Sequence, residues 1–544
     1  MKNANRFNLL DEPWILVLDT QGKQQKLSLK QIFSQASELS TLANELPTVD
    51  VSILRLLLAI MHRALVPTKL PSFEAALDLW KKQWTEGLDV GTILAYLEEQ
   101  RDAFWLIGDK PFKQVHVENH GTPYDAAKLH GSISQSGGKA RLFNQINGAD
   151  KQELNADLAA RMLLHYIDYG DSAAKFVAND KLIDGNIIGG VKVSHTSQFG
   201  AVIPKGETLE KTLLLNFVLA DAANGWTLWE TRLPVWELPA VAKRTMIAAD
   251  SNSQADLLTT LWRKVELTWN DSNKCTGFVF HYDTPKSVLL RSETMAGVKS
   301  TKATAAKPPE LSYVQFHSNR AVWRDFGSLF VKEDLKESAK CLLWLAELDH
   351  YELINANTLN IQTVGIDYGA MMSAIDEIYS DSIEVNAAIL QDMGNSWAPR
   401  ISDLVAITDK AVSAIGYLAV MLAEACGASK PGGGKSDPKI DGKRDSAKAE
   451  AYNTLDPKFR GWLIQIDENT KMTEKLDEWK SIVKDTLTDI AGDLIESCGS
   501  GAITGRNGMT SAVAESKFRA ALHKALYGDS KKTKNNATEV DDGY

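Results

Sequence analysis

The last third of the chain contains four segments with helical periodicity, and this pattern limits the possible folds more than any other feature. Their apolar residues recur at spacings of three and four, which is typical of amphipathic helices. Four such helices with modest connections predict an antiparallel bundle. The segments are residues 402–427, 451–466, 475–497 and 511–528.

The first part of the chain has a mixed character. Between about residues 185 and 330, short runs such as "KVELTW" (264–269), "TGFVFHY" (276–282) and "SVLLRS" (287–292) predict strands. Strand character ends near residue 375, where "VGIDYGAMMSAIDE" is expected to lead into a helix.

The sequence therefore predicts an α+β fold in which a large mixed α/β N-terminal domain precedes an all-α four-helix bundle. We expect the mixed domain to span residues 1–380 and the bundle residues 381–528. The polar residues 529–544 are expected to form a disordered tail.

Composition excludes some classes of protein. The formal net charge of −10 argues against a chain that coats nucleic acid by itself, but not against local contacts inside a larger assembly. No window has the apolar length needed to cross a bilayer, and the N-terminus lacks a signal-peptide core. We expect a cytoplasmic protein without a membrane partner. The cysteines lie far apart in sequence, so buried free thiols are expected: Cys275, Cys341, Cys426 and Cys498.

Three motifs imitate catalytic or cofactor sites without meeting their requirements. "KPGGGKSDPK" lacks the first glycine and the preceding strand of a phosphate-binding loop, and its composition suits a linker. His116 and His120 have a metal-ligand spacing but lie in a loop-like stretch with no third ligand in view. Asp168 and Asp171 are expected in a turn, where aspartate is common. We therefore expect no active site, no metal and no cofactor.

Six blocks of sequence carry a resemblance to a known family. In order, they resemble blocks of CasA, the large subunit of the type I-E CRISPR surveillance complex Cascade, and the similarity extends from residue 7 to about residue 528. The blocks are "FNLLDEPWI" (7–15), "YLEEQRDAFWLIGDKPFKQV" (96–115), "LEKTLLLNFVL" (209–219), "ADLLTTLWRKVEL" (255–267), "NRAVWRDF" (319–326) and "VGIDYGAMMSAIDE" (364–377).

The resemblance implies a recognition subunit that is not an enzyme. Such a subunit reads the short protospacer-adjacent motif in double-stranded target DNA, starts strand separation beside it and helps to recruit the CRISPR helicase-nuclease, while the guide RNA reads the sequence. Its implied partners are the guide RNA, the target DNA, the helicase-nuclease and the backbone and small subunits of Cascade.

The resemblance also implies three DNA-facing elements. The first is a loop of small residues after a helix, which lets the backbone approach the groove; the alternative is a plain helix-ending turn. The second is a hairpin lysine near Tyr282, for which Lys286 is the nearest candidate. Basic residues downstream suggest a phosphate footprint or, alternatively, a solvated loop. The first loop comprises Ser172, Ala173, Ala174 and Lys175.

The third element is a stiff turn that acts as a wedge in the duplex. Apolar side chains suit this task because stacking on bases recovers part of the cost of unstacking, and methionine is flexible and polarizable. The alternative is that both methionines fill the core at a helix start. The implied wedge residues are Gly369, Ala370, Met371, Met372 and Ser373.

A further segment, residues 130–145, resembles the part of the family that contacts the guide RNA, with Lys139, Arg141 and Phe143 supplying charge and a stacking ring. Its composition also suits disorder. Two other functions stay open: a metal-dependent hydrolase whose site is not recognised, and a purely architectural helical scaffold. The sequence does not define which DNA motif is preferred or whether the isolated chain binds DNA.

Overall fold

The structure is a computed structural model, and the chain forms two compact units. Unit 1 comprises residues 1–322 and 332–383, and unit 2 comprises residues 323–331 and 384–544. Unit 2 thus includes a segment, 323–331, that the sequence analysis placed in the first domain. The structure describes residues 7–115, 121–131, 133, 152–172, 182–183, 186–187, 193–221, 225–239, 252–281, 290–300, 308–331, 336–354, 358–369, 372, 374–391, 397–428, 438–506 and 508–528.

Unit 1 begins with a small antiparallel sheet in the order β2-β1-β3. β1 (Ile15–Asp19) and β2 (Gln24–Leu27) form a hairpin, and β3 (Leu39–Leu42) pairs with the other edge of β1. Beside this sheet, α2 (Pro47–Leu65) is buried along most of its length, so it is a core helix of the unit.

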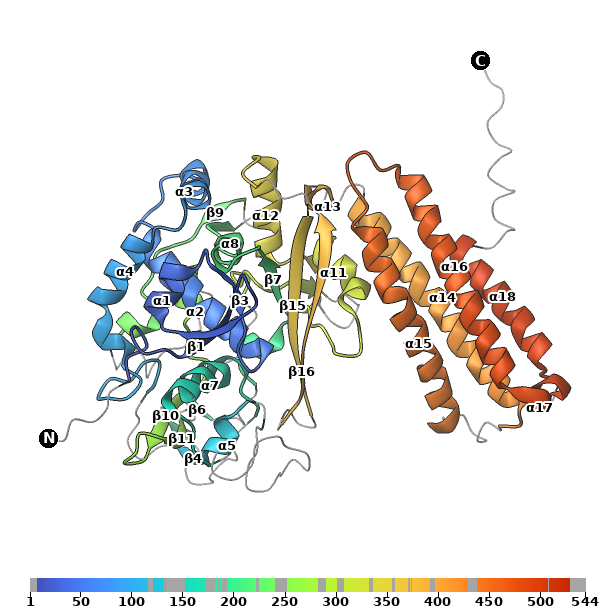
Figure 1. Cartoon of the computed structure of the whole chain (residues 1–544), viewed down its shortest axis with the longest axis horizontal. Coiled ribbons are helices and arrows are strands. Elements are labelled where there is room, and N and C mark those ends of the chain that lie inside the picture. The colour runs from blue at the N-terminus through green and yellow to red at the C-terminus, as the bar shows by residue number, and fades with distance from the viewer. Residues whose placement is uncertain are drawn as a thin grey trace, which may run out of the picture. The chain divides into compact units, whose positions relative to one another are not determined.

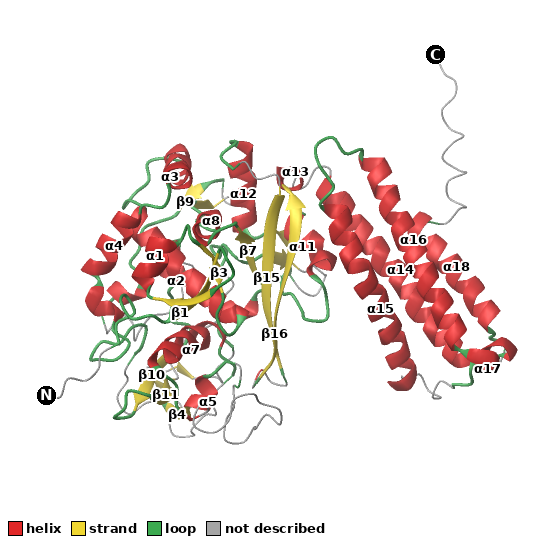
Figure 2. Ribbon diagram, viewed as in Figure 1, coloured by secondary structure: helices red, strands yellow, loops and turns green. Residues whose placement is uncertain are grey.

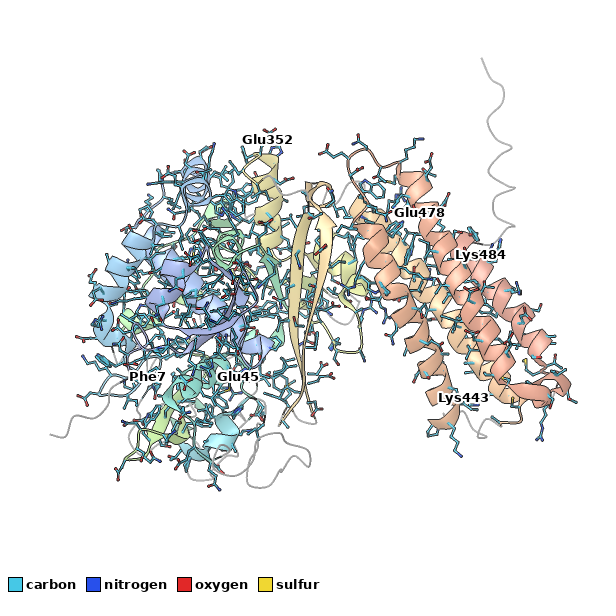
Figure 3. The ribbon with its side chains drawn as sticks, in the orientation of Figure 1. Phe7, Glu45, Glu352, Lys443, Glu478 and Lys484 are labelled. Carbon is cyan, nitrogen blue, oxygen red and sulfur yellow. The ribbon has the colours of Figure 1, made fainter. Side chains whose placement is uncertain are left out.

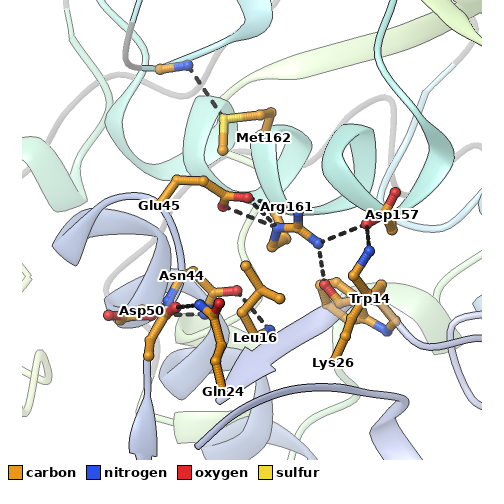
Figure 4. Close-up of polar contacts among 12 residues, drawn as sticks. Trp14, Leu16, Gln24, Lys26, Asn44, Glu45, Asp50, Asp157, Arg161 and Met162 are labelled. Atoms are coloured by element: carbon orange, nitrogen blue, oxygen red, sulfur yellow. Dashed lines mark hydrogen bonds and ion pairs between the residues drawn. The ribbon is translucent and has the colours of Figure 1, made fainter. Parts of the chain in front are cut away.

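One arginine joins this sheet to α7 (Ala156–Tyr169), the helix that precedes the predicted DNA-facing loop (Figure 4). Arg161 of α7 donates to Glu45 at 2.7 Å and to the backbone oxygen of Trp14. One turn earlier, Asp157 accepts from Lys26 of β2 at 2.5 Å. These contacts, of which only the one to Lys26 is exposed, fix the position of α7 and therefore the direction in which the chain leaves it.

A second sheet, in the order β16-β15-β7, supports the other predicted DNA-facing element. β15 (Thr358–Tyr368) pairs with β7 (Ala201–Lys205), and β16 (Ile375–Asn386) lies on its other side. The prediction of a helix after Met371 and Met372 is therefore wrong, and strand character extends past residue 375. Figure 1 shows the β15–β16 hairpin as the longest strand pair in the unit.

A third sheet has the order β10-β11-β4. β10 (Lys264–Trp269) coincides with the predicted strand "KVELTW". β11 (Cys275–His281) confirms most of the predicted strand "TGFVFHY". β4 (Thr122–Asp125) pairs with β11. The predicted strand "SVLLRS" is wrong for residues 290–292, which form no strand, and its first half lies outside the described residues.

Shorter helices and strands complete unit 1. Its remaining helices are α1 (Leu29–Gln35), α3 (Phe73–Glu86), α4 (Val90–Glu99), α5 (Ala126–Leu129), α8 (Leu209–Leu215), α10 (Gln254–Leu257) and α12 (Lys340–His350). Its remaining strands are β5 (Leu182–Ile183), β6 (Asn186–Ile187), β8 (Ala220–Asp221), β9 (Thr227–Leu228), β12 (Val298–Ser300), β13 (Leu311–Tyr313) and β14 (Lys336–Glu337).

Ser72 caps α3, because its hydroxyl accepts a hydrogen bond from the backbone N–H of Ala75 at 3.3 Å. A Ser72→Ala variant is expected to lower the free energy of unfolding of unit 1 by about 1 kcal/mol. Chemical denaturation measures the change, and Ser72→Asp serves as the control because aspartate restores the cap. Equal losses in the two variants would contradict this role.

Unit 2 is built of helices, as Figure 2 shows. α14 packs against α15, α16 and α18, and α11 packs on α14. Aromatic rings fill the core between them: Trp323 stacks on Phe459 at 4.7 Å, and Trp479 meets the same ring edge-on at 5.1 Å. The helices are α11 (Phe326–Phe330), α13 (Ala387–Gln391), α14 (Trp397–Ala425), α15 (Pro438–Leu463), α16 (Met472–Ser497), α17 (Gly499–Thr504) and α18 (Ser511–Tyr527).

α14 is more apolar than the sequence analysis allowed. By length and composition alone it could cross a membrane, so the expectation that no window has that character is wrong. Most of its apolar residues are buried against the other helices of unit 2, as in the central helix of a bundle, although Tyr417 is 65% exposed.

Candidate nucleic-acid interface

The turn between β15 and β16 is held by backbone hydrogen bonds. The N–H of Gly369 donates to the oxygen of Ala374 at 3.0 Å, and the N–H of Met372 donates to the oxygen of Gly369 at 2.8 Å. A Cβ on Gly369 would lie 2.6 Å from a carboxylate oxygen of Asp376, so a larger residue there would displace this exposed side chain. Four residues before Gly369, within β15, Gly365 leaves room for the ring of Tyr379. Both glycines of "VGIDYG" therefore serve close packing within the hairpin.

Met372 is exposed and lies in a strained backbone conformation. Its side chain is 45% exposed and its φ is 56°, in the left-handed region that bulky residues rarely adopt. Such a conformation costs about 1–3 kcal/mol and persists only where the surroundings impose it. The interpretation of Met372 as core filling is therefore wrong. Met371, Ala370 and Ser373 lie outside the described residues.

Ser172, the first residue of the first predicted loop, is bonded to this turn. The N–H of Ser172 donates to the backbone oxygen of Met372 at 2.7 Å. Nearby, the hydroxyl of Tyr368 donates to the backbone oxygen of Tyr169, at the end of α7, at 2.7 Å. Two elements that are about 200 residues apart in sequence thus meet through two hydrogen bonds. Ala173, Ala174 and Lys175 lie outside the described residues.

Arg263 fixes the backbone from which this loop leaves α7. Its Nη2 donates to the oxygens of Gly170 and Asp171 at 2.8 and 2.6 Å, and its Nε donates to Ser194 at 2.9 Å. The Asp171 carboxylate is buried and pairs with Lys128. Sequence reasoning missed this clamp. The sequence did contain a signal for it, because Arg263 and Lys264 of "LWRKVEL" lie in a strongly apolar stretch. Charges that are buried with such a stretch need partners.

Asp168 and Asp171, which the sequence analysis expected in a turn, are buried, being 3% and 1% exposed. Asp168 belongs to the last turn of α7. Burial raises the pKa of Asp168, while the charges of Lys113 and Arg55 oppose that rise. The two carboxylates are parts of a buried ionic framework beneath the loop and are not solvent-facing acid and base groups.

The structure describes only part of the stretch downstream of Tyr282 in which basic residues suggested a phosphate footprint. Arg291 and Lys299 are exposed in unit 1, and so is Glu310. Glu293, an acidic residue of the same stretch, is buried and bonded to Arg55 at 3.0 Å. Arg324 belongs to unit 2, where it pairs with Asp409 at 3.1 Å. Exposed charges of both signs therefore remain in the described part of this stretch.

Several predicted site residues lie outside the described residues. They include the hairpin candidates Tyr282 and Lys286, which follow directly after β11. The same holds for the guide-RNA candidates Lys139, Arg141 and Phe143, and for the possible metal ligands His116 and His120. Among the residues that the structure does describe, no three His, Cys, Asp or Glu side chains gather in a way that could hold a metal ion.

A polar cavity of about 550 Å³ lies elsewhere in unit 1, between β3, β7, α8 and the β15–β16 strands. Lys205 extends into it and donates to Thr41 at 2.8 Å. Burial lowers the pKa of Lys205, and the opposite charge of Asp50 counters that shift. None of the residues predicted from the sequence to bind DNA lines this cavity.

Comparisons with known proteins agree with this architecture. The chain is 30% identical to CRISPR-associated protein CasA/Cse1 of Thermus thermophilus over 240 residues. That match covers 44% of this chain and 43% of the relative, so it spans less than half of the relative's length.

Solved structures match over nearly the whole chain. The crystal structure of Thermobifida fusca Cse1 has a TM-score of 0.78 at 25% identity and covers 96% of this chain and 98% of that one. A chain of a CRISPR RNA-guided surveillance complex has a TM-score of 0.64 at 15% identity, which shows a shared fold, and covers 96% of this chain and 100% of that one. The sequence profile of the family described as CRISPR-associated protein Cse1 matches residues 8–490. The chain belongs to this Cse1 (CasA) family.

Proposed function

We propose that this chain is the large subunit of a type I-E CRISPR RNA-guided surveillance complex. In this role it recognises the protospacer-adjacent motif in double-stranded DNA and starts strand separation beside it. The membership of the Cse1 family supports the assignment to such a complex. The recognition of DNA is a finer claim, and it depends on the surface formed by the turn 369–374 and the loop that begins at Ser172.

One observation carries this proposal: the hydrogen bond from the Ser172 N–H to the Met372 oxygen. It joins the first residue of the small-residue loop to Met372 of the wedge turn, although the two are distant in sequence. The Met372 side chain is exposed at this point, and we propose that the rest of the small-residue loop lies beside it. This combination suits a groove that is read through close backbone approach and shape, with little side-chain code.

The physical task of the turn is to separate neighbouring base pairs. Unstacking a base step costs a few kcal/mol, and an inserted apolar side chain recovers part of that cost by contact with the bases. A mobile turn would lose much of this gain in ordering entropy. The hydrogen bonds at Gly369, Met372 and Tyr368 order the turn in advance.

The other subunits and the guide RNA complete the proposed activity. The segment with Lys139, Arg141 and Phe143 is proposed to contact the guide RNA, and the Tyr282–Lys286 stretch to contact DNA. We assign no catalytic step to this chain. Its proposed contribution to cleavage of the target is recruitment of the CRISPR helicase-nuclease, and its proposed compartment is the cytoplasm.

The test measures how well a reconstituted complex that carries Met372→Gly opens a DNA duplex. Glycine accepts a φ of 56° without strain, so this variant is expected to be at least as stable as the wild type. It lacks the wedge side chain, and we expect opening of a motif-bearing duplex to fall by about tenfold, equivalent to about 1.4 kcal/mol. Fluorescence of a base analogue beside the motif measures the opening.

Leu233→Gly is the matched control, because Leu233 is also 45% exposed and lies in unit 1. This variant is expected to open DNA as the wild type does. Randomising the motif should abolish opening for both proteins. Normal opening by Met372→Gly would show that Met372 is not the wedge, and failure of the wild type to distinguish motifs would contradict the proposed function.

A further inference from the structure

Two of the four cysteines meet at one end of the helical unit. Cys426 follows α14 and Cys498 follows α16, and they are 72 positions apart in sequence. The Sγ of Cys426 donates to the backbone oxygen of Cys498 at 3.6 Å, and the Sγ of Cys498 donates to the backbone oxygen of Leu494 at 3.1 Å. The expectation of four buried thiols is wrong for this pair, since Cys426 is exposed and Cys498 is half-buried.

The pair differs from the other two cysteines in accessibility. Cys426 is exposed and Cys498 is half-buried, whereas Cys275 and Cys341 are buried. Burial raises the pKa of Cys275 to about 12, and it raises that of Cys341 as well. Only a thiolate that reagents can reach is reactive, so these two buried thiols are expected to be inert.

Two cationic side chains lie near this pair of cysteines. The guanidinium of Arg506 lies 3.0 Å from the place of a Cβ on Gly427, the residue after Cys426. The charge of Lys443 in α15, labelled in Figure 3, favours the thiolate of Cys498, although burial raises the pKa of that thiol overall. Both cysteines follow helix C-termini, where the helix dipole disfavours an anion, so these cations offset an unfavourable local field.

We propose that Cys426 and Cys498 form a redox-active dithiol that low-molecular-weight disulfides convert into an intramolecular disulfide. The more exposed Cys426 thiolate attacks one sulfur of the small disulfide, forms a mixed disulfide and releases one small thiol. Cys498 then gives up its proton and attacks the Cys426 sulfur, which forms the Sγ–Sγ bond and releases the second small thiol. Two protein thiols are oxidised, and one small disulfide is reduced to two thiols.

The new bond would connect the C-terminal ends of α14 and α16 and close a loop that contains all of α15. A cross-link across a long loop restricts the unfolded chain and stabilises the folded one. In a reducing compartment such disulfides are transient and respond to the thiol balance. The modification site lies within unit 2, whereas the proposed DNA-binding surface lies within unit 1.

The experiment uses the full-length reduced chain in mixtures of glutathione disulfide and glutathione. We expect the folded protein to lose two of its four thiols, to lose the mass of two hydrogen atoms and to yield one cross-linked peptide that joins Cys426 to Cys498. The unfolding temperature of unit 2 should rise and should return to its starting value after reduction. Cys498→Ser should instead accumulate a glutathione adduct on Cys426.

Peptide mapping of the wild type keeps the test independent of how the variant folds. Cys275 and Cys341 serve as internal controls, because an alkylating reagent should leave both unmodified in the folded state. Retention of all four thiols, disulfides only between chains, or a cross-link through Cys275 or Cys341 would each overturn the proposal.

Discussion

Replacing Arg55 with methionine is expected to lower the free energy of unfolding of unit 1 by about 3–5 kcal/mol. The Arg55 Nη1 donates to both carboxylate oxygens of Glu293 at 3.0 Å, and the two side chains are 1% and 0% exposed. Burial alone would raise the pKa of Glu293, but the charge and hydrogen bonds of Arg55 outweigh it and lower that pKa. Methionine would leave this carboxylate buried without a counter-charge. Chemical denaturation measures the loss.

Two controls separate the missing charge from lost packing. In Arg55→Met/Glu293→Gln both charges are absent, and the amide oxygen can still accept from the N–H of Met295, so most of the stability should return. Arg232→Met breaks an exposed pair with Glu230, 48% and 57% exposed, and should cost less than about 1 kcal/mol. A double variant as unstable as Arg55→Met would contradict the electrostatic explanation.

Acidification is expected to destabilise unit 1 through two buried histidines. Burial lowers the pKa values of His62 and His165 to about 3. In the unfolded chain both titrate near their ordinary pKa of about 6.5, so the unfolded state binds more protons below that pH. Stability is therefore present above about pH 6.5 and is lost as the pH falls toward about pH 3. The loss is about 2 kcal/mol for each histidine between about pH 7 and pH 5.

Denaturation curves across this pH range measure the slope. His62→Phe should remove about half of the histidine contribution, since a phenyl ring fits beside Phe217, whose ring centroid lies 4.7 Å from that of His62. His317→Gln, at a side chain that is 52% exposed, is the control for the loss of a histidine as such. A slope that is unaltered in His62→Phe would show that the acid sensitivity arises from other groups.

Local sequence patterns predicted the elements whose own residues determine them. α16 and α18 were recognisable because their apolar residues repeat at helical spacing, and β10 because it is a compact run of strand-forming residues. β16 was missed since "IDEIYSDSIEVN" is rich in Asp, Glu and Ser, which rarely favour strands. Its conformation comes from pairing with β15, a contact that local periodicity does not contain.

The candidate site was only partly predictable for the same reason. Glycines around an apolar pair indicated a special turn at residues 369–374, but nothing near Met372 in the sequence points to Ser172. The clamp of Arg263 on Gly170 is also a contact between distant segments. Residue types thus suggested which elements matter, whereas their meeting depends on how the sheets and α7 fold together.

The apolar character of α14 has a consequence for how unit 2 is made in the cell. About 100 residues separate the end of α14 at Ala425 from the end of α18 at Tyr527. At usual rates of translation, roughly 5–20 s pass before the last covering helix is synthesised. During that interval the nascent chain exposes an apolar segment of the kind that chaperones bind.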